Sequence, residues 1–165
     1  MPTDPAASLY EVVLAIHIMA VVVAFGVTFA YPILFAVAAR HDPRSLPLLH
    51  RFEYTVERIL VNPGLVLVIA AGVYLASKGH YWSDFFVQWG LAVAIVIGGL
   101  VGSVTIPASK RAEAAAARDL AASGDGEIVL SDEYRALTRR LSLVGALTSV
   151  LVLVTILLMA LQVGS

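Results

Sequence analysis

The chain lacks cysteine and carries little charge. None of its 165 residues is cysteine, and only 14% are Asp, Glu, Lys or Arg, against about 25% in an average soluble protein. Without thiols the chain cannot form disulfides, thiolate metal sites or a cysteine nucleophile. The net charge of -1 and the lack of a basic stripe also argue against nucleic acid as a partner.

Motifs of soluble enzymes are missing as well. The sequence contains no Gly-rich phosphate loop, no nucleophile elbow and no paired His-Glu zinc signature. The N-terminus does not resemble a secretory signal, because Asp4 and Glu11 stand where a signal has basic residues. Its apolar run is also about twice the 7–15 residues of a signal core. We therefore expect the first apolar run to stay in the membrane.

Long apolar runs make up most of what is present. The 59% hydrophobic content is concentrated in four segments of about 18 residues or more, each long enough to cross about 30 Å of hydrocarbon as a helix. Helices are the default there, because lipid offers backbone groups no hydrogen-bond partners. The sequence thus predicts an all-α fold: a single domain over 1–165, an integral membrane four-helix bundle that has the lipid bilayer as partner. The predicted transmembrane helices cover residues 9–38, 59–76, 85–107 and 141–161.

Lys and Arg residues gather on one side of the predicted bundle. Ten of the eleven lie after helix one, at the start of helix two, or between helices three and four, and only Lys78 lies in the opposite turn. The positive-inside rule then places both termini outside. We predict a multi-pass protein of a bacterial plasma membrane (a cell inner membrane), N-out and C-out. Tyr81, Trp82 and Trp89 belong to the outer aromatic belt.

The connection between helices three and four is expected to be helical. Residues 109–123 are good helix formers almost throughout, and the Ser-Gly-Asp-Gly sequence of 123–126 breaks the helix. Ser131 can cap the next helix. We therefore predict that helices three and four extend into the cytoplasm as a helical hairpin over 108–140.

His17 is the most informative residue of helix one. An imidazole within a membrane span must hydrogen-bond, bind a ligand or relay protons. Because small and polar residues mark helix contacts in membranes, the His17 face should point into the bundle. A structural hydrogen bond and a functional role both remain open for His17. At 100° per residue, the residues that share this face are Tyr10, His17, Ala20, Val21, Ala24, Thr28 and Tyr31.

Helix two carries a proline and a polar stripe. Pro63 removes a backbone donor within the apolar run, so a kink is expected there. His50, Glu53 and Glu57 share one face, and such a stripe could bind a metal ion. Because the stripe lies where the helix leaves the membrane, the simpler interpretation is a solvent-exposed face.

Small residues recur at four-residue spacing in helices three and four. Gly98 and Gly102 form one such face, and Gly145 and Ser149 form another. Such faces let membrane helices approach closely. They are compatible with tight bundling and with a homo-oligomer or a membrane partner protein.

Short motifs in helices one and two resemble known membrane families. They are His17-Ile-Met-Ala, Gly26, Phe29-Ala-Tyr-Pro-Ile-Leu-Phe35, Glu57-Arg58, Pro63 and Gly72-Val-Tyr-Leu75. They resemble the HemJ-type bacterial membrane protoporphyrinogen oxidases, and CopD-like copper-resistance membrane domains share the outline. The chain is most similar to an uncharacterised family of predicted integral membrane proteins of similar length. The resemblance covers under half of the chain.

The oxidase resemblance implies haem b, with His17 as the ligand of the iron. It also implies a haem-dependent oxidoreductase. The chain departs from the oxidase pattern at Ile33, where that family has arginine, and at Ala24, where it has tryptophan. The chain can therefore share the four-helix bundle of that family without sharing the oxidase reaction.

Depth in the membrane limits the other residues of such a haem site. His41 and His50 belong to the opposite side, about 30 Å from His17, so a second axial histidine would have to be His80. Otherwise the iron would be five-coordinate. We expect Tyr10, Thr28 and Tyr31, on the His17 face, to line or orient the site. A copper site has less support, because Met19 does not share that face.

Two functions therefore remain open. The first is a haem- or porphyrin-binding membrane protein, oxidoreductase-like, that acts through His17. The second is a non-enzymatic membrane bundle acting as an accessory or interaction subunit. In that case His17 is a structural residue, and the basic segments contact a partner or anionic lipid.

Overall fold

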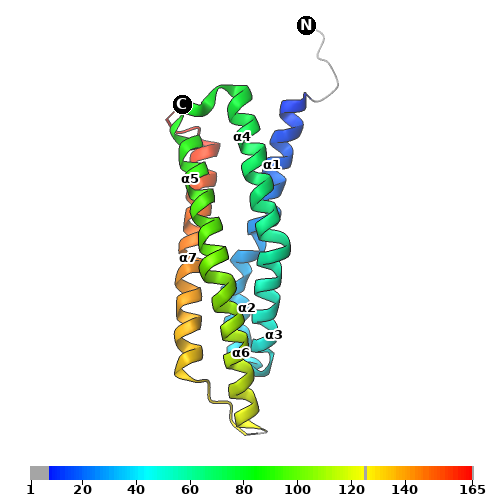
Figure 1. Cartoon of the computed structure of the whole chain (residues 1–165), viewed down its shortest axis with the longest axis vertical. Helices are drawn as coiled ribbons and strands as arrows, with labels where there is room; N and C mark the ends of the chain where they lie inside the picture. Colours follow the sequence, from blue (N-terminus) through cyan, green and yellow to red (C-terminus); the bar gives the residue numbers. More distant parts are fainter. Residues whose placement is uncertain (1–7, 125, 165) are drawn as a thin grey trace.

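The structure, a computed structural model, describes residues 8–124 and 126–164. Met1, Asp4 and Asp125 lie outside them. Four long helical rods lie side by side, each antiparallel to the next along the chain (Figure 1), and each is long and apolar enough to cross a membrane. The described residues contain no strand, so the all-α prediction is confirmed. The rods comprise Leu9–His41, Pro43–Gly79, Phe85–Ser123 and Asp132–Ala160.

Three of the four rods are interrupted by a short irregular segment. The first rod consists of α1 (Leu9–Gly26), the 3-10 segment η1 (Val27–Ala30) and α2 (Tyr31–His41). The second consists of the 3-10 segment η2 (Pro43–Ser45), α3 (Leu46–Val56), the π segment η3 (Glu57–Val61) and α4 (Asn62–Gly79). The third consists of α5 (Phe85–Leu100), the π segment η5 (Val101–Thr105) and α6 (Ile106–Ser123). The fourth is the uninterrupted α7 (Asp132–Ala160), and the 3-10 turn η4 (Tyr81–Ser83) joins α4 to α5.

Prolines explain these interruptions. Pro32, Pro63 and Pro107 each stand in the first turn of the helix that follows the irregular segment. A proline ring cannot donate to the preceding turn and clashes with its carbonyl, so the turn before it tightens or widens. The kink expected at Pro63 is therefore realised as a π turn.

The interruptions lie near one level and divide the bundle into two halves. The helices α1, α4 and α5, of 18, 18 and 16 residues, reach from that level to the same end of the molecule, a length of about 24–27 Å. We call this part, with the C-terminal part of α7, the terminal half. The other part, formed by α2, α3, α6 and the start of α7, holds most of the basic residues and is called the basic half (Figure 1).

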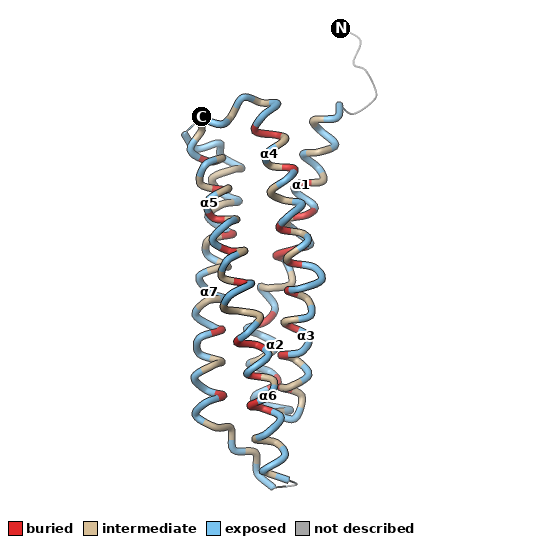
Figure 2. The backbone as a smooth tube through the Cα atoms, viewed as in Figure 1, coloured by how far each residue is buried: buried red, intermediate tan, exposed pale blue. Residues whose placement is uncertain are grey.

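Two separate apolar cores lie in these halves. One centres on the level of the interruptions and extends into the terminal half, where Phe25, Leu65 and Ile97 meet. The other lies in the basic half, where alanines of α6 face Leu46 and Tyr134. The outward-facing residues are largely exposed (Figure 2), including large apolar ones such as Ile59 and Val66. An apolar exterior of this extent is suited to contact with lipid.

Glycines bring some helices together, but most of them are not the glycines that the sequence predicted. A Cβ at Gly64 would lie 2.6 Å from the Cβ of Ala24, so α1 and α4 pack closely there. Gly98 packs against Leu65 in the same way, with a Cβ position 3.0 Å from its Cδ2. By contrast, Gly102 and Gly145 have no atom within 4 Å of their Cβ positions. Of the glycines in the two predicted small-residue faces, all of which the structure describes, Gly98 alone packs closely against another helix.

Candidate functional site

A cavity of about 470 Å³ lies in the terminal half, between α1, α4, α5 and α7. Its walls are mainly aliphatic, with contributions such as Leu14, Ile69 and Leu91. Tyr10, Tyr81, Trp82 and Gln162 line it near the ends of their elements. Pockets of about 300–1,000 Å³ with apolar walls and a few polar groups are typical of small-molecule sites.

His17 is the ionisable side chain that faces this cavity from the middle of a helix. Its ring is buried, and its Nδ1 lies 3.0 Å from the backbone carbonyl oxygen of Val68 on α4. Because a carbonyl only accepts hydrogen bonds, we assign the proton to Nδ1. The Nε2 atom makes no hydrogen bond to a described residue and is therefore available to a ligand. Histidines that bind metals are commonly oriented in this way, through a donated bond from the other ring nitrogen.

Two glycines create the space that the cavity side chains occupy. A Cβ at Gly72 would lie 3.3 Å from Cε1 of His17, so the absence of a side chain lets the ring pack against α4. At Gly90 a Cβ would overlap the terminal methyl group of Met159, which reaches across from α7. The sequence thus makes room on α4 for the imidazole of His17 and on α5 for the thioether of Met159.

The structure brings together only part of the predicted haem site. Tyr10 lines the cavity with His17. The hydroxyl of Thr28 in η1 donates to Phe25 O at the end of α1, at 2.7 Å, and Tyr31 lies at the start of α2, in the other half. His80 is exposed, adopts a left-handed conformation (φ 60°) at the end of α4, and does not line the cavity.

Met159 is the cavity residue that the sequence did not reveal. It belongs to the last turns of α7 and lines the cavity together with His17. The sequence showed only that Met159 lies near the end of the fourth helix. The sequence does not show which face of α7 turns toward the cavity, because that depends on how α7 packs against α5.

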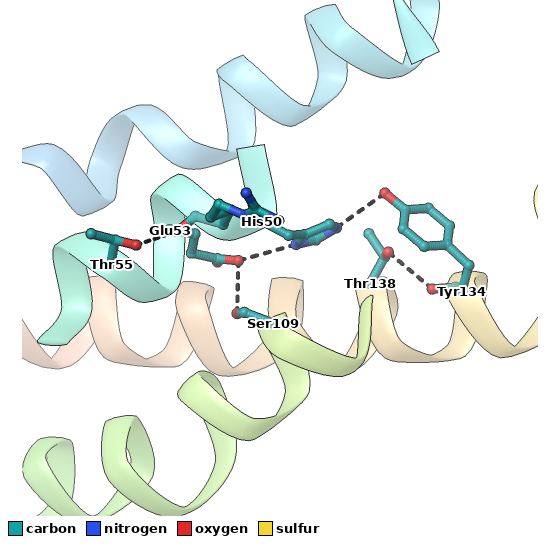
Figure 3. A network of polar contacts seen from close by, with 7 residues as sticks. His50, Glu53, Thr55, Ser109, Tyr134 and Thr138 are labelled. Carbon is teal, nitrogen blue, oxygen red and sulfur yellow. Dashed lines mark hydrogen bonds and ion pairs between the residues drawn. The ribbon is translucent and has the colours of Figure 1, made fainter. Parts of the chain in front are cut away.

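The polar stripe of the second rod is buried, so the solvent-exposed interpretation is wrong. His50, Glu53 and Glu57 all have low exposure. The helix α6 packs along α3 and covers His50 and Glu53, while η3, which carries Glu57, packs against α1. Figure 3 shows Glu53 Oε2 between His50 Nδ1, at 3.3 Å, and Ser109 Oγ, at 2.8 Å. On its other side, His50 Nε2 lies 3.2 Å from the hydroxyl of Tyr134. Within the part of the chain that the structure describes, no three His, Asp or Glu residues could hold a metal ion, so the metal alternative gains no support.

The match to a protein family decides the membrane assignment. A family model described as "Predicted integral membrane protein (DUF2269)" matches residues 11–163. The chain belongs to this family. No curated protein and no solved structure matches it. The resemblance to an uncharacterised membrane family is therefore confirmed, and this family member is an integral, multi-pass membrane protein. The similarity to the HemJ-type oxidases and CopD-like domains, and the haem that it implies, stay predictions.

Proposed function

We propose that this protein binds a tetrapyrrole, haem b, in the cavity of the terminal half, with His17 as the iron ligand, and acts in electron transfer. The observation that carries the proposal is the orientation of His17. Its Nδ1 is held by the Val68 carbonyl, and its Nε2 has no protein partner among the described residues. A structural histidine in lipid would be expected to use both nitrogens, because an unpaired polar atom is costly there.

The residues around the cavity fit the chemistry of the group. Aliphatic walls suit the faces of a porphyrin ring, and the polar side chains of Tyr10, Tyr81 and Gln162 stand near the end of the bundle, where carboxylate substituents could reach water. Met159 supplies a thioether from α7, a ligand that pairs with histidine in electron-transfer haems. When bound, the haem iron would supply one-electron redox chemistry.

The protein's own contribution is orientation and exclusion of water. The Val68 carbonyl fixes the tautomer and the direction of the His17 ring, and Gly72 lets the ring pack closely against α4. The apolar walls exclude water from the ligand, which favours electron transfer over reactions with solvent.

An absorption measurement tests this proposal. The protein is purified in detergent from cells supplied with haem, and we expect a Soret band that the His17→Ala variant lacks. His80→Ala is the matched control, because His80 lies outside the cavity, and it should keep the band. A colourless native protein, or a band that persists in His17→Ala, would refute the assignment.

The second ligand is tested separately. Met159→Leu retains a similar apolar volume but removes the sulfur, so we expect the haem to stay bound with the spectrum of a five-coordinate iron. An unchanged spectrum would exclude Met159 as a ligand and leave the His17 assignment intact.

We further infer that the basic half faces the cytoplasm of a bacterial plasma membrane. Support comes from the ten of eleven Lys and Arg residues in or next to that half. Because the chain has no cysteine, single cysteines give an unambiguous test. A membrane-impermeant maleimide applied to intact cells should label Ser83→Cys but not Glu127→Cys; the reverse pattern would refute this orientation.

A further inference from the structure

A buried polar cluster in the basic half has more acidic groups than basic partners. It contains two carboxyl groups, Glu53 and Glu57, and one imidazole, His50, all of low exposure. Basic residues next to the cluster in the sequence are exposed or engaged elsewhere: Arg51 is exposed and pairs with Glu113 at 2.7 Å, and Lys110 lies over the ring of Tyr54. Arg58, which follows Glu57, is exposed. Two buried carboxylates beside a single imidazole would leave a negative charge uncompensated, at a high cost in free energy.

Part of the cluster is a continuous hydrogen-bonded chain (Figure 3). It runs from the Tyr134 hydroxyl to His50 Nε2 over 3.2 Å and from His50 Nδ1 to Glu53 Oε2 over 3.3 Å. Each ring nitrogen therefore has one oxygen partner. An imidazole with partners on both nitrogens can accept a proton on one side and release one on the other.

The far end of the cluster holds two polar atoms without partners. Glu57 Oε2 and the hydroxyl of Tyr31 are buried, and neither has a hydrogen-bond partner among the described residues. Glu57 is 4% exposed and Tyr31 is 8% exposed. Glu57 opens the π segment η3 and lies one turn beyond Glu53 on the same buried face. Buried polar atoms nearly always have a hydrogen-bond partner. The two unpartnered atoms therefore indicate that a small species occupies the space beside them.

We propose that this cluster is a proton-relay site that loads and unloads a proton at Glu57 from the basic end of the bundle. The proposal does not depend on haem binding. The titratable groups that face it are Tyr31 from α2, His50 and Glu53 from α3, Glu57 from η3 and Tyr134 from α7. The helix α6 supplies the neutral Ser109 and, beside Tyr134, Asp119, whose carboxylate accepts from the Ser131 N–H. A proton suits the site better than a metal ion, because no described group of three His, Asp or Glu residues could hold a metal.

The proton is conserved at each step of the relay. A proton that reaches Tyr134, a buried residue in the first turn of α7, is taken up by the phenol oxygen as the hydroxyl proton passes to His50 Nε2. The proton on His50 Nδ1 then passes to Glu53 Oε2, and the neutral ring resets by rotation. Glu53 and Glu57 are separated by about 6 Å of helical rise, a gap that one water molecule between polar groups can bridge. The proton ends on Glu57, whose unpaired oxygen it satisfies.

Infrared spectroscopy of the purified protein tests the loading of Glu57. We expect the carbonyl stretch of a protonated carboxyl group to appear and disappear reversibly with pH in the native protein. Glu57→Gln should lack this signal, and Glu57→Asp should shift it while it retains a carboxyl group. Glu113→Gln, which removes a carboxyl group outside the cluster, should leave it unchanged. The proposal would be overturned if the native protein lacked this signal or if the signal survived in Glu57→Gln. It would also be overturned if the signal followed sodium concentration instead of pH.

The relay itself is tested by the rate of deuterium exchange of the same signal. After dilution into heavy water, His50→Phe should exchange about a hundredfold more slowly than the native protein, the lower end of what a positioned acid–base group contributes. Glu113→Gln should exchange at the native rate. Equal rates for His50→Phe and the native protein would show that the proton does not pass through His50.

Discussion

In the basic half of the bundle, α3 packs against α6 over buried alanines, whereas in the terminal half the helices leave a cavity of about 470 Å³. The close contact covers His50 and Glu53, so these side chains use one another and Ser109 as partners. The open contact leaves His17 with one protein partner and one free nitrogen. In the basic half, small residues let the helices pack closely around the buried polar groups. In the terminal half, glycines make room for side chains that line a cavity large enough for a ligand.

The strongest way to break the basic half is to remove its central acceptor. Glu53→Ala leaves His50 Nδ1 and the Ser109 hydroxyl without a carboxylate, and we expect a loss of about 3 kcal/mol in the free energy of unfolding. Glu113→Ala is the control: it removes a carboxylate whose partner Arg51 is exposed, and should cost about 0–1 kcal/mol. Denaturant titration in detergent measures both. Equal losses would mean that the buried cluster does not stabilise the fold.

Adding volume compares the packing of the two halves directly. Ala112 is fully buried between α6 and its neighbours, so Ala112→Leu should cost about 1–3 kcal/mol through overpacking. Ala94 lines the cavity of the terminal half, and Ala94→Leu should change the stability by less than about 1 kcal/mol while it reduces the space for a ligand. Thermal unfolding of both variants is the measurement. A larger loss for Ala94→Leu would contradict the difference in packing.

The smallest effect concerns the first turn of α7, which positions Tyr134. Ser131 Oγ accepts from the backbone N–H of Tyr134 at 3.2 Å, which confirms the predicted N-cap. Ser131→Ala should cost about 1 kcal/mol and increase amide hydrogen exchange in that turn. Exchange near His17 should stay at the native level, because the two halves have separate cores. Faster exchange around both residues would show that the halves are coupled.

The sequence was sufficient for the features that depend on local composition. Apolar runs predicted the four rods, small residues predicted the burial of His17, and Ser131 predicted a helix start. Pro63 predicted a kink but not its form, because whether a turn widens or tightens depends on the neighbouring helices.

The burial of the polar stripe and the place of Met159 in the cavity were missed, because both depend on contacts between distant segments. His50, Glu53 and Glu57 are polar and lie beyond an apolar run, so nothing local distinguishes them from a solvated face. The burial of His50 and Glu53 requires the alanines of α6, which follow them by more than 50 residues. Met159 likewise faces the cavity only because of how α7 packs against α5.

The central claim is that the ligand site belongs to the terminal half alone. A haem titration followed by the Soret band, on native protein, His17→Ala and Glu53→Gln in one detergent series, tests it most directly. The account predicts native binding by Glu53→Gln and no specific binding by His17→Ala. Native binding by a folded His17→Ala, or loss of binding in a folded Glu53→Gln, would contradict it.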